Sequence, residues 1–219
     1  MRYLTIVALL VSLAACNDRD EMKEYSITIT NLTHNQPFSP VAGVLHAAGF
    51  KAWQTGEVAS DALEKLAEGG DASGLLAMQQ DSPQYHAAAP LFAGETMTFQ
   101  LMADSDEQDR LTLATMLINT NDAFSGINAM ELDVMGHGHT QVVYGYALDA
   151  GTEANTELAG SIPGPADGGE GYNPERNDVT SKVTNHGGVV SQQDGHMDSV
   201  LSESHRFDGP VMRVEIKRL

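Results

Sequence analysis

Cysteine is almost absent from this chain, which holds Cys16 and no other among its 219 residues. An intrachain disulfide needs two cysteines, so the fold has to be stabilised by its hydrophobic core alone. Cysteine-ligated zinc sites, iron–sulfur clusters and blue-copper centres all need thiolate ligands. We exclude these metal centres, and a cysteine nucleophile as well, because Cys16 is expected to carry lipid for the reason given below.

Positive charge is also scarce. The chain has 12 lysines and arginines against 30 acidic residues, a formal net charge of −18. Nucleic acids and anionic lipid head groups bind basic surfaces, so this balance argues against both as partners. The excess of negative charge favours cations as ligands instead.

Long hydrophobic runs are missing except near the start, where the apolar stretch from Leu4 to Leu13 follows Arg2. Charge, apolar run and small residues in that order are typical of a secretory signal. The run is too short to span a bilayer as a permanent helix. The segment Leu13-Ala14-Ala15-Cys16 resembles the end of a bacterial lipoprotein signal, which implies cleavage before Cys16 and acylation of that cysteine.

Three parts are therefore expected along the chain. Residues 1–15 are predicted to be a lipoprotein signal peptide. Residues 16–24 are predicted to be the lipidated cysteine and a polar tether, and residues 25–219 a folded domain long enough to bury one core.

Strand patterns dominate that domain. Tyr25, Ile27 and Ile29 alternate with polar residues, which is typical of a strand with one buried face. Further strands are expected at residues 95–103, 110–118, 142–149 and 210–219. The acidic segment "DSDEQD" between the first two of these is predicted to be the tip of a hairpin.

Helices are expected to be few and short. "SDALEKLAEGG" has Ser60 or Asp61 to cap its start and two glycines to end it, and "ASGLLAMQQ" follows as a second short helical turn. Residues 150–182 form a long segment rich in glycine, proline and asparagine, of a kind that is often functional. These elements predict an all-β fold, an antiparallel β-sandwich with a few short helices in its loops.

Carboxylates follow two of the predicted strands. Asp122 lies just past the strand that ends near Ile118, and Asp149 and Glu153 lie at the end of another. If these strands run in the same direction, the acids meet at one pole of the sandwich. Hard cations such as Ca²⁺ bind carboxylates, backbone carbonyls and water there. The alternative is that the acids are exposed turn residues.

The sequence resembles the spondin domain, the N-terminal module of F-spondin and mindin, from about Tyr25 to Leu219. The resemblance rests on "YSITITNLTHNQPFSPV", "GEVASDALEKLAEGGDASGLLA", "TNDAFSGINAMEL", "YALDAGTEANTE" and "VMRVEIKRL". It implies a C2-like β-sandwich that binds one Ca²⁺ at a loop pole.

The family's calcium ligands are an aspartate in "S-P-D-W-x-x-G" and two acids in "D-A-G-T-D". The resemblance carries these roles to Asp122 in "TNDAFSG" and to Asp149 and Glu153 in "DAGTE". Two positions depart from the family pattern, because Phe124 replaces the tryptophan and Glu153 replaces an aspartate. A bound cation would offset the repulsion between Asp149 and Glu153.

A second metal interpretation concerns the segment "MGHGHT". Met135, His137 and His139 alternate along it, so their side chains could face one way and bind copper or zinc in a periplasmic lipoprotein. The alternative is a solvated loop. No G-x-S-x-G or H-E-x-x-H motif is present, and no spacing of Ser, His and Asp indicates a catalytic triad. We therefore do not expect an enzyme.

Together these patterns predict a calcium-binding, non-catalytic binding or adhesion module of the bacterial cell envelope. Membrane contact is expected through the lipid on Cys16 alone, at the outer membrane, with the domain facing the periplasm or the cell surface. The expected partner is an unidentified envelope or extracellular ligand and not a nucleic acid.

Overall fold

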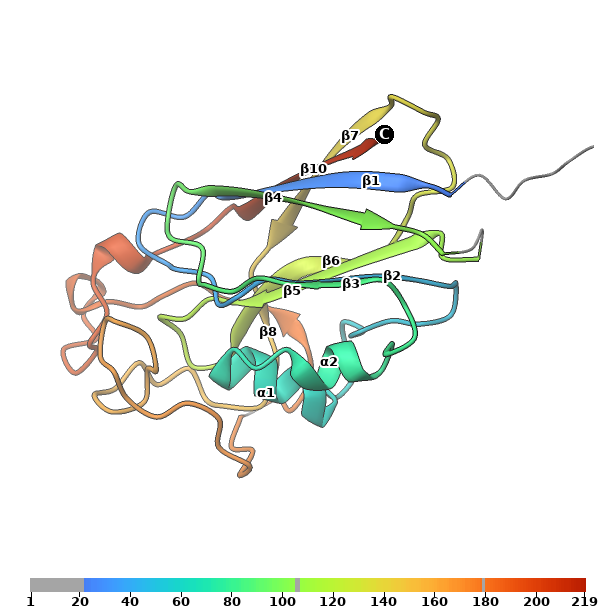
Figure 1. Cartoon of the computed structure of the whole chain (residues 1–219). Coiled ribbons are helices and arrows are strands. Elements are labelled where there is room, and N and C mark those ends of the chain that lie inside the picture. The colour runs from blue at the N-terminus through green and yellow to red at the C-terminus, as the bar shows by residue number, and fades with distance from the viewer. Residues whose placement is uncertain (1–21, 105–106, 179) are drawn as a thin grey trace, which may run out of the picture.

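The computed structural model describes residues 22–104, 107–178 and 180–219 (Figure 1). Cys16, the predicted signal peptide and most of the predicted tether lie outside these residues. None of the described helices is long and apolar enough to cross a membrane.

The described residues form two antiparallel sheets (Figure 1). The four-stranded sheet has the order β4-β1-β10-β7, with β1 Glu24–Asn31, β4 Thr96–Met102, β7 Thr140–Tyr146 and β10 Pro210–Arg218. The six-stranded sheet has the order β3-β2-β5-β6-β8-β9, with β2 Ala42–His46, β3 Gln84–His86, β5 Arg110–Met116, β6 Ala123–Glu131, β8 Leu148–Asp149 and β9 Thr184–Asn185. This confirms the predicted β-sandwich.

The main core lies between the two sheets. Tyr25, Ile27 and Ile29 are fully buried while the polar residues between them are only partly buried, as the alternation along β1 predicted. They pack against residues of the facing sheet such as Leu111 and Leu113 of β5. Each such side chain contributes about 1.5–3 kcal/mol when it leaves water.

A second core lies on the other face of the six-stranded sheet, where the two short helices cover it (Figure 1). Helix α1 spans Asp61–Gly69 and helix α2 spans Ser73–Ala77. Leu63 and Leu66 of α1 pack there with Phe124 of β6. The sheet is therefore buried on both faces, which fits the almost unbroken burial of β5.

Helix α1 begins and ends as its sequence predicts. The hydroxyl of Ser60 accepts a hydrogen bond from the Leu63 amide, and Gly70 ends the helix in the left-handed conformation at φ 70°. An unexpected feature is that Glu64 and Glu68 are buried on this helix, with 3% and 1% of their surfaces exposed.

Two details of the predicted strands are wrong. The strands at 95–103 and 110–118 do not form a hairpin, because β4 pairs with β1 and β5 lies in the other sheet. The predicted strand at 142–149 is in fact two strands. It leaves the four-stranded sheet after Tyr146, passes through the buried Ala147, and joins the six-stranded sheet as β8.

Candidate functional site

Strand pairing brings two of the predicted acids together. In the antiparallel pair of β6 and β8, Ala123 lies opposite Asp149, so Asp122 directly precedes the paired position. The backbone amide of Ala150 donates a 3.3 Å hydrogen bond to the carbonyl oxygen of Asp122. Since β5 and β8 are both antiparallel to β6, they run in the same direction, which is the condition that the sequence prediction required.

Asp122 is a fully buried carboxylate with one oxygen satisfied and one not. Its Oδ2 accepts hydrogen bonds from the Thr152 amide (2.8 Å), the Thr152 hydroxyl (3.3 Å) and the Glu153 amide (3.2 Å). Its Oδ1 is buried, and no described residue donates a hydrogen bond to it. Desolvation, together with the negative charge of Asp149, raises the pKa of Asp122 to about 7 despite these hydrogen bonds.

Asp149 is held by the turn that follows it. Its Oδ1 accepts a 2.8 Å hydrogen bond from the Gly151 amide, and its Oδ2 accepts a 2.6 Å bond from Asn155 Nδ2. Gly151 has φ 68°, and a Cβ there would lie 2.3 Å from the carbonyl oxygen of Lys182. Only glycine fits this position, so the turn that orients Asp149 depends on it.

Glu153 completes the predicted set. Its pKa is raised to about 7, first by burial, then by the negative charges of Glu68 and Asp122, while a hydrogen bond from Asn121 opposes the shift. The structure therefore brings Asp122, Asp149 and Glu153 to one pole, as predicted. It also adds a fourth carboxylate, Glu68, that sequence reasoning missed.

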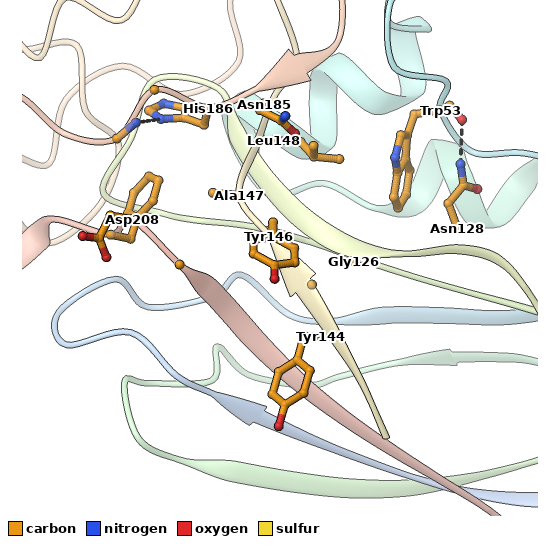
Figure 2. Close-up of a pocket in the computed structure, with 15 residues that line it drawn as sticks. Trp53, Gly126, Asn128, Tyr144, Tyr146, Ala147, Leu148, Asn185, His186 and Asp208 are labelled. Atoms are coloured by element: carbon orange, nitrogen blue, oxygen red, sulfur yellow. Dashed lines mark hydrogen bonds between the residues drawn. The ribbon is translucent and has the colours of Figure 1, made fainter. Parts of the chain in front are cut away.

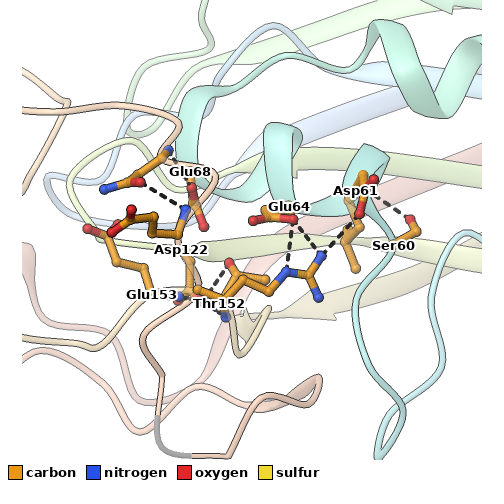
Figure 3. Close-up of polar contacts among 11 residues, drawn as sticks. Ser60, Asp61, Glu64, Glu68, Asp122, Thr152 and Glu153 are labelled. Carbon is orange, nitrogen blue, oxygen red and sulfur yellow. Dashed lines mark hydrogen bonds and ion pairs between the residues drawn. The ribbon is translucent and has the colours of Figure 1, made fainter.

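Glu68 reaches this pole from the last turn of α1 (Figure 3). One of its oxygens accepts a 2.9 Å hydrogen bond from the Asn173 amide, and its Oε1 is buried with no hydrogen-bond partner among the described residues. Burial is also the main cause that raises its pKa. A signal was present in the sequence, because Glu64 and Glu68 are four residues apart and flank the apolar Ala67 on one helix face.

Glu64 has a different role from its neighbour. Arg176, in the long loop after β8, donates hydrogen bonds from both Nε and Nη2 to Glu64 Oε2 (Figure 3). This ion pair ties the loop to α1 and neutralises Glu64.

The other four carboxylates form one group, which we call the acidic pole: Glu68, Asp122, Asp149 and Glu153.

The acidic pole suits a hard cation in charge and in donor chemistry, because two of its buried carboxylate oxygens have no hydrogen-bond partner in the part of the chain that the structure describes. Within the described part of the chain, however, no three His, Cys, Asp or Glu side chains are arranged closely enough to hold a metal by themselves. A cation here would therefore need backbone, amide or water oxygens as further ligands.

The segment considered for copper or zinc is arranged differently from its prediction. Met135 is fully buried in the main core, while His137 and His139 are exposed in the turn before β7. The thioether therefore lies on the side of the chain that faces the core, away from solvent. This separation leaves the two histidines without the sulfur ligand that the pattern suggested.

A cleft of about 740 Å³ lies beside the acidic pole, along the free edge of β7 (Figure 2). Its lining includes the side chains of Trp53, Asn128, Tyr144, Tyr146, Asn185, His186, Phe207 and Asp208. Sequence reasoning did not find it, because its walls come from segments that are distant in the chain.

A chain of hydrogen bonds joins the cleft to the acidic pole. The Gly188 amide donates to His186 Nδ1 at 3.0 Å, so the Nε2 proton of this imidazole points to Asn155 Oδ1 at 3.1 Å. Asn155 in turn donates to Asp149, as described above. Burial lowers the pKa of His186, which keeps the ring neutral.

The sequence of this chain matches one family model, described as Spondin_N, over residues 22–161. The match spans well over half of the chain and includes all four acids of the acidic pole. No curated protein matches the chain.

Proposed function

Because the chain belongs to the spondin N-terminal family, as its sequence motifs indicated, we propose that it is a binding or adhesion module that holds one Ca²⁺ at the acidic pole. The family is not known as a family of enzymes, and we propose no catalytic role for this chain. The cation would be structural.

The observation that carries this proposal is the state of Asp122. A carboxylate with no exposed surface, one unpartnered oxygen and a second acid beside it is costly to keep ionised. A divalent cation removes that cost, since it pairs with the free oxygen and screens the neighbouring charges. Asp122, Asp149 and Glu153 would hold it, with Glu68 beside them.

At the acidic pole a bound cation would connect three segments of the chain. It lies where the β5–β6 connection, the turn after β8 and the end of α1 meet, and each of these segments contributes an acid. Bound Ca²⁺ would hold the three together. The loops at this pole would then present a fixed surface to a partner.

Anchoring to the envelope is part of the same proposal and rests on the Leu13-Ala14-Ala15-Cys16 segment. Lipid on Cys16 would attach the domain to the membrane, and the acidic domain itself would stay off anionic lipid. Cys16→Ser is expected to leave the precursor unprocessed or to release the protein from membranes. Maturation of this variant with retention on membranes in high salt would contradict the anchor.

Calcium binding is tested by thermal unfolding in millimolar Ca²⁺ and in chelator. A ligand that binds only the folded state stabilises it by about 2.7 kcal/mol at a hundredfold excess over its Kd. For a domain of this size that corresponds to roughly 5–11 °C in Tm. Equal Tm values under the two conditions, with no heat in a calcium titration, would refute the cation site.

A further inference from the structure

The cleft beside β7 has the features of a ligand site that is separate from the acidic pole. It is bounded on one side by β7, an edge strand that pairs, among the described strands, with β10 alone (Figure 2). Its other side is formed by the loop that carries Trp53, by β6 and by the segment around His186. Its volume of about 740 Å³ is within the range of small-molecule sites, roughly 300–1,000 Å³.

Exposed aromatic rings line this cleft. Tyr144 and Tyr146 are 52% and 58% exposed, although tyrosines are usually at least half buried in a folded domain. They alternate with the interior-facing Val143 and Gly145, so the sheet fixes both rings on one side of β7. Contiguous exposed apolar surface of this kind marks interaction sites.

Trp53 forms the opposite wall and is rigidly held. Its ring lies edge-on to Phe124, with centroids 5.1 Å apart. Asn128 fixes the backbone beneath it, because its Nδ2 donates to the Trp53 carbonyl (2.6 Å) and its Oδ1 accepts from the Ala52 amide (3.0 Å). The aromatic surface is therefore organised before any ligand arrives, which lowers the entropy cost of binding.

Two polar side chains at the cleft are free to bind a ligand. Asn185 and Asp208 are exposed, and within the described residues neither side chain has a hydrogen-bond or ion-pair partner. An amide offers a donor and an acceptor, and a carboxylate offers two acceptors. Such planar groups match the adjacent hydroxyls of a sugar, whose C–H faces pack on aromatic rings.

Charge narrows the class of ligand. Among the described residues, no lysine or arginine lines the cleft itself. Two arginines lie beside it and are already paired, Arg213 next to Tyr144 with Glu215, and Arg206 with Asp194. The whole chain carries a formal charge of −18. Sulfated, phosphorylated or carboxylated ligands would meet this negative field without an unpaired basic partner. We propose that the cleft is a binding site for a neutral oligosaccharide. The inference names the ligand of the proposed binding module, but it does not depend on the cation.

The sole tryptophan of the chain is the natural probe. Because Trp53 lines the cleft, its fluorescence reports occupancy. The protein is titrated with neutral hexasaccharides of the gluco, manno, galacto and chito series, and with oligolysine and a sulfated hexasaccharide for comparison, each in Ca²⁺ and in chelator. We expect a saturable emission change with at least one series, and Tyr144→Ala and Tyr146→Ala should each weaken it at least tenfold.

Phe92→Ala provides the matched control, because Phe92 is 54% exposed and does not line the cleft. It should bind the sugar with an affinity within twofold of wild type.

Gly209→Val provides a second variant, since a side chain at Gly209 meets no atom within 4 Å and the φ there is ordinary. It should fold normally and narrow the cleft, with a loss of affinity.

Three results would overturn the inference. They are no emission change with any neutral series at millimolar concentration, equal losses in Phe92→Ala and Tyr146→Ala, or saturable binding only of oligolysine or of sulfated glycans. The sugar-binding result can be distinguished from the result for the cation site. Calcium stabilisation is read from Tm without sugar, and sugar binding is read in chelator as well.

Discussion

Replacing Asp122 by asparagine should change stability in opposite directions with and without calcium. Asparagine keeps the size of the side chain and one carbonyl oxygen, so it can still accept the hydrogen bonds from Thr152 and Glu153. It removes the buried charge that lies beside Asp149. It also removes the charge that a hard cation needs.

The magnitude follows from the pKa of Asp122, which is raised from 3.8 to about 7. A shift of about three pKa units corresponds to about 4 kcal/mol, the penalty that folding incurs at neutral pH in the absence of a cation. Burial of the extra amide protons offsets part of the gain. We therefore expect the variant to be about 1–3 kcal/mol more stable in chelator, or roughly 2–12 °C in Tm.

The assay is thermal unfolding of both proteins at pH 7, in chelator and in millimolar Ca²⁺, with a calorimetric calcium titration. Wild type should gain stability from calcium, and Asp122→Asn should gain little or none. Asp104→Asn is the control, because Asp104 is exposed and its charge is not among those that shift the pKa of Asp122 or of Glu153. It should match wild type in both conditions.

Two results would refute the reasoning. If Asp122→Asn is less stable than wild type in chelator, the ionised carboxylate does not destabilise the fold as its buried environment indicates. If the variant binds calcium with wild-type affinity, the acidic pole is not the metal site. In that case Asp122 has only its structural role, as the acceptor that holds the turn after β8.

Three further predictions concern the same region. In chelator, the stability of wild type relative to Asp122→Asn should rise by about 1 kcal/mol as pH falls from 8 to 6.5, because the folded-state pKa of Asp122, about 7, lies above its unfolded value and folding therefore takes up a proton. The comparison cancels the opposite effect of His46, His186 and His205, whose pKa values burial lowers, and a relative stability that falls over this range would contradict the prediction. Calcium affinity should fall over the same range, by up to about tenfold measured calorimetrically, since protons compete for the carboxylates of the acidic pole. Gly151→Ala should lose at least about 2 kcal/mol in denaturant unfolding, because its Cβ would meet Lys182 at a positive φ, whereas Gly187→Ala, with open space around it, should be neutral.

Local patterns in the sequence were reliable where neighbours along the chain decide the structure. The alternation from Tyr25 to Ile29 predicted β1, and Ser60 and Gly70 predicted the ends of α1. The turn after β8 was also readable, since Gly151 fixes its backbone and the acids stand at set distances from it. Periodicity and capping are properties of a few adjacent residues, so the sequence alone was enough for them.

Tertiary structure decided which strands pair and which acids meet. The patterns at 95–103 and 110–118 are correct for strands, but an alternating pattern records which face is buried and not which strand lies alongside. The hairpin prediction therefore failed. The crossing of the chain at Ala147 between sheets was equally invisible, because strand character continues on both sides of it.

The acidic pole and the cleft show the same division. Motifs indicated Asp122, Asp149 and Glu153, but Glu68 joined them only because α1 packs on the outer face of the six-stranded sheet and its last turn ends at this pole. The cleft required Trp53 and Tyr146, nearly a hundred positions apart, to line the same hollow. Such a meeting depends on how both sheets and the loops pack, and no local sequence pattern encodes it.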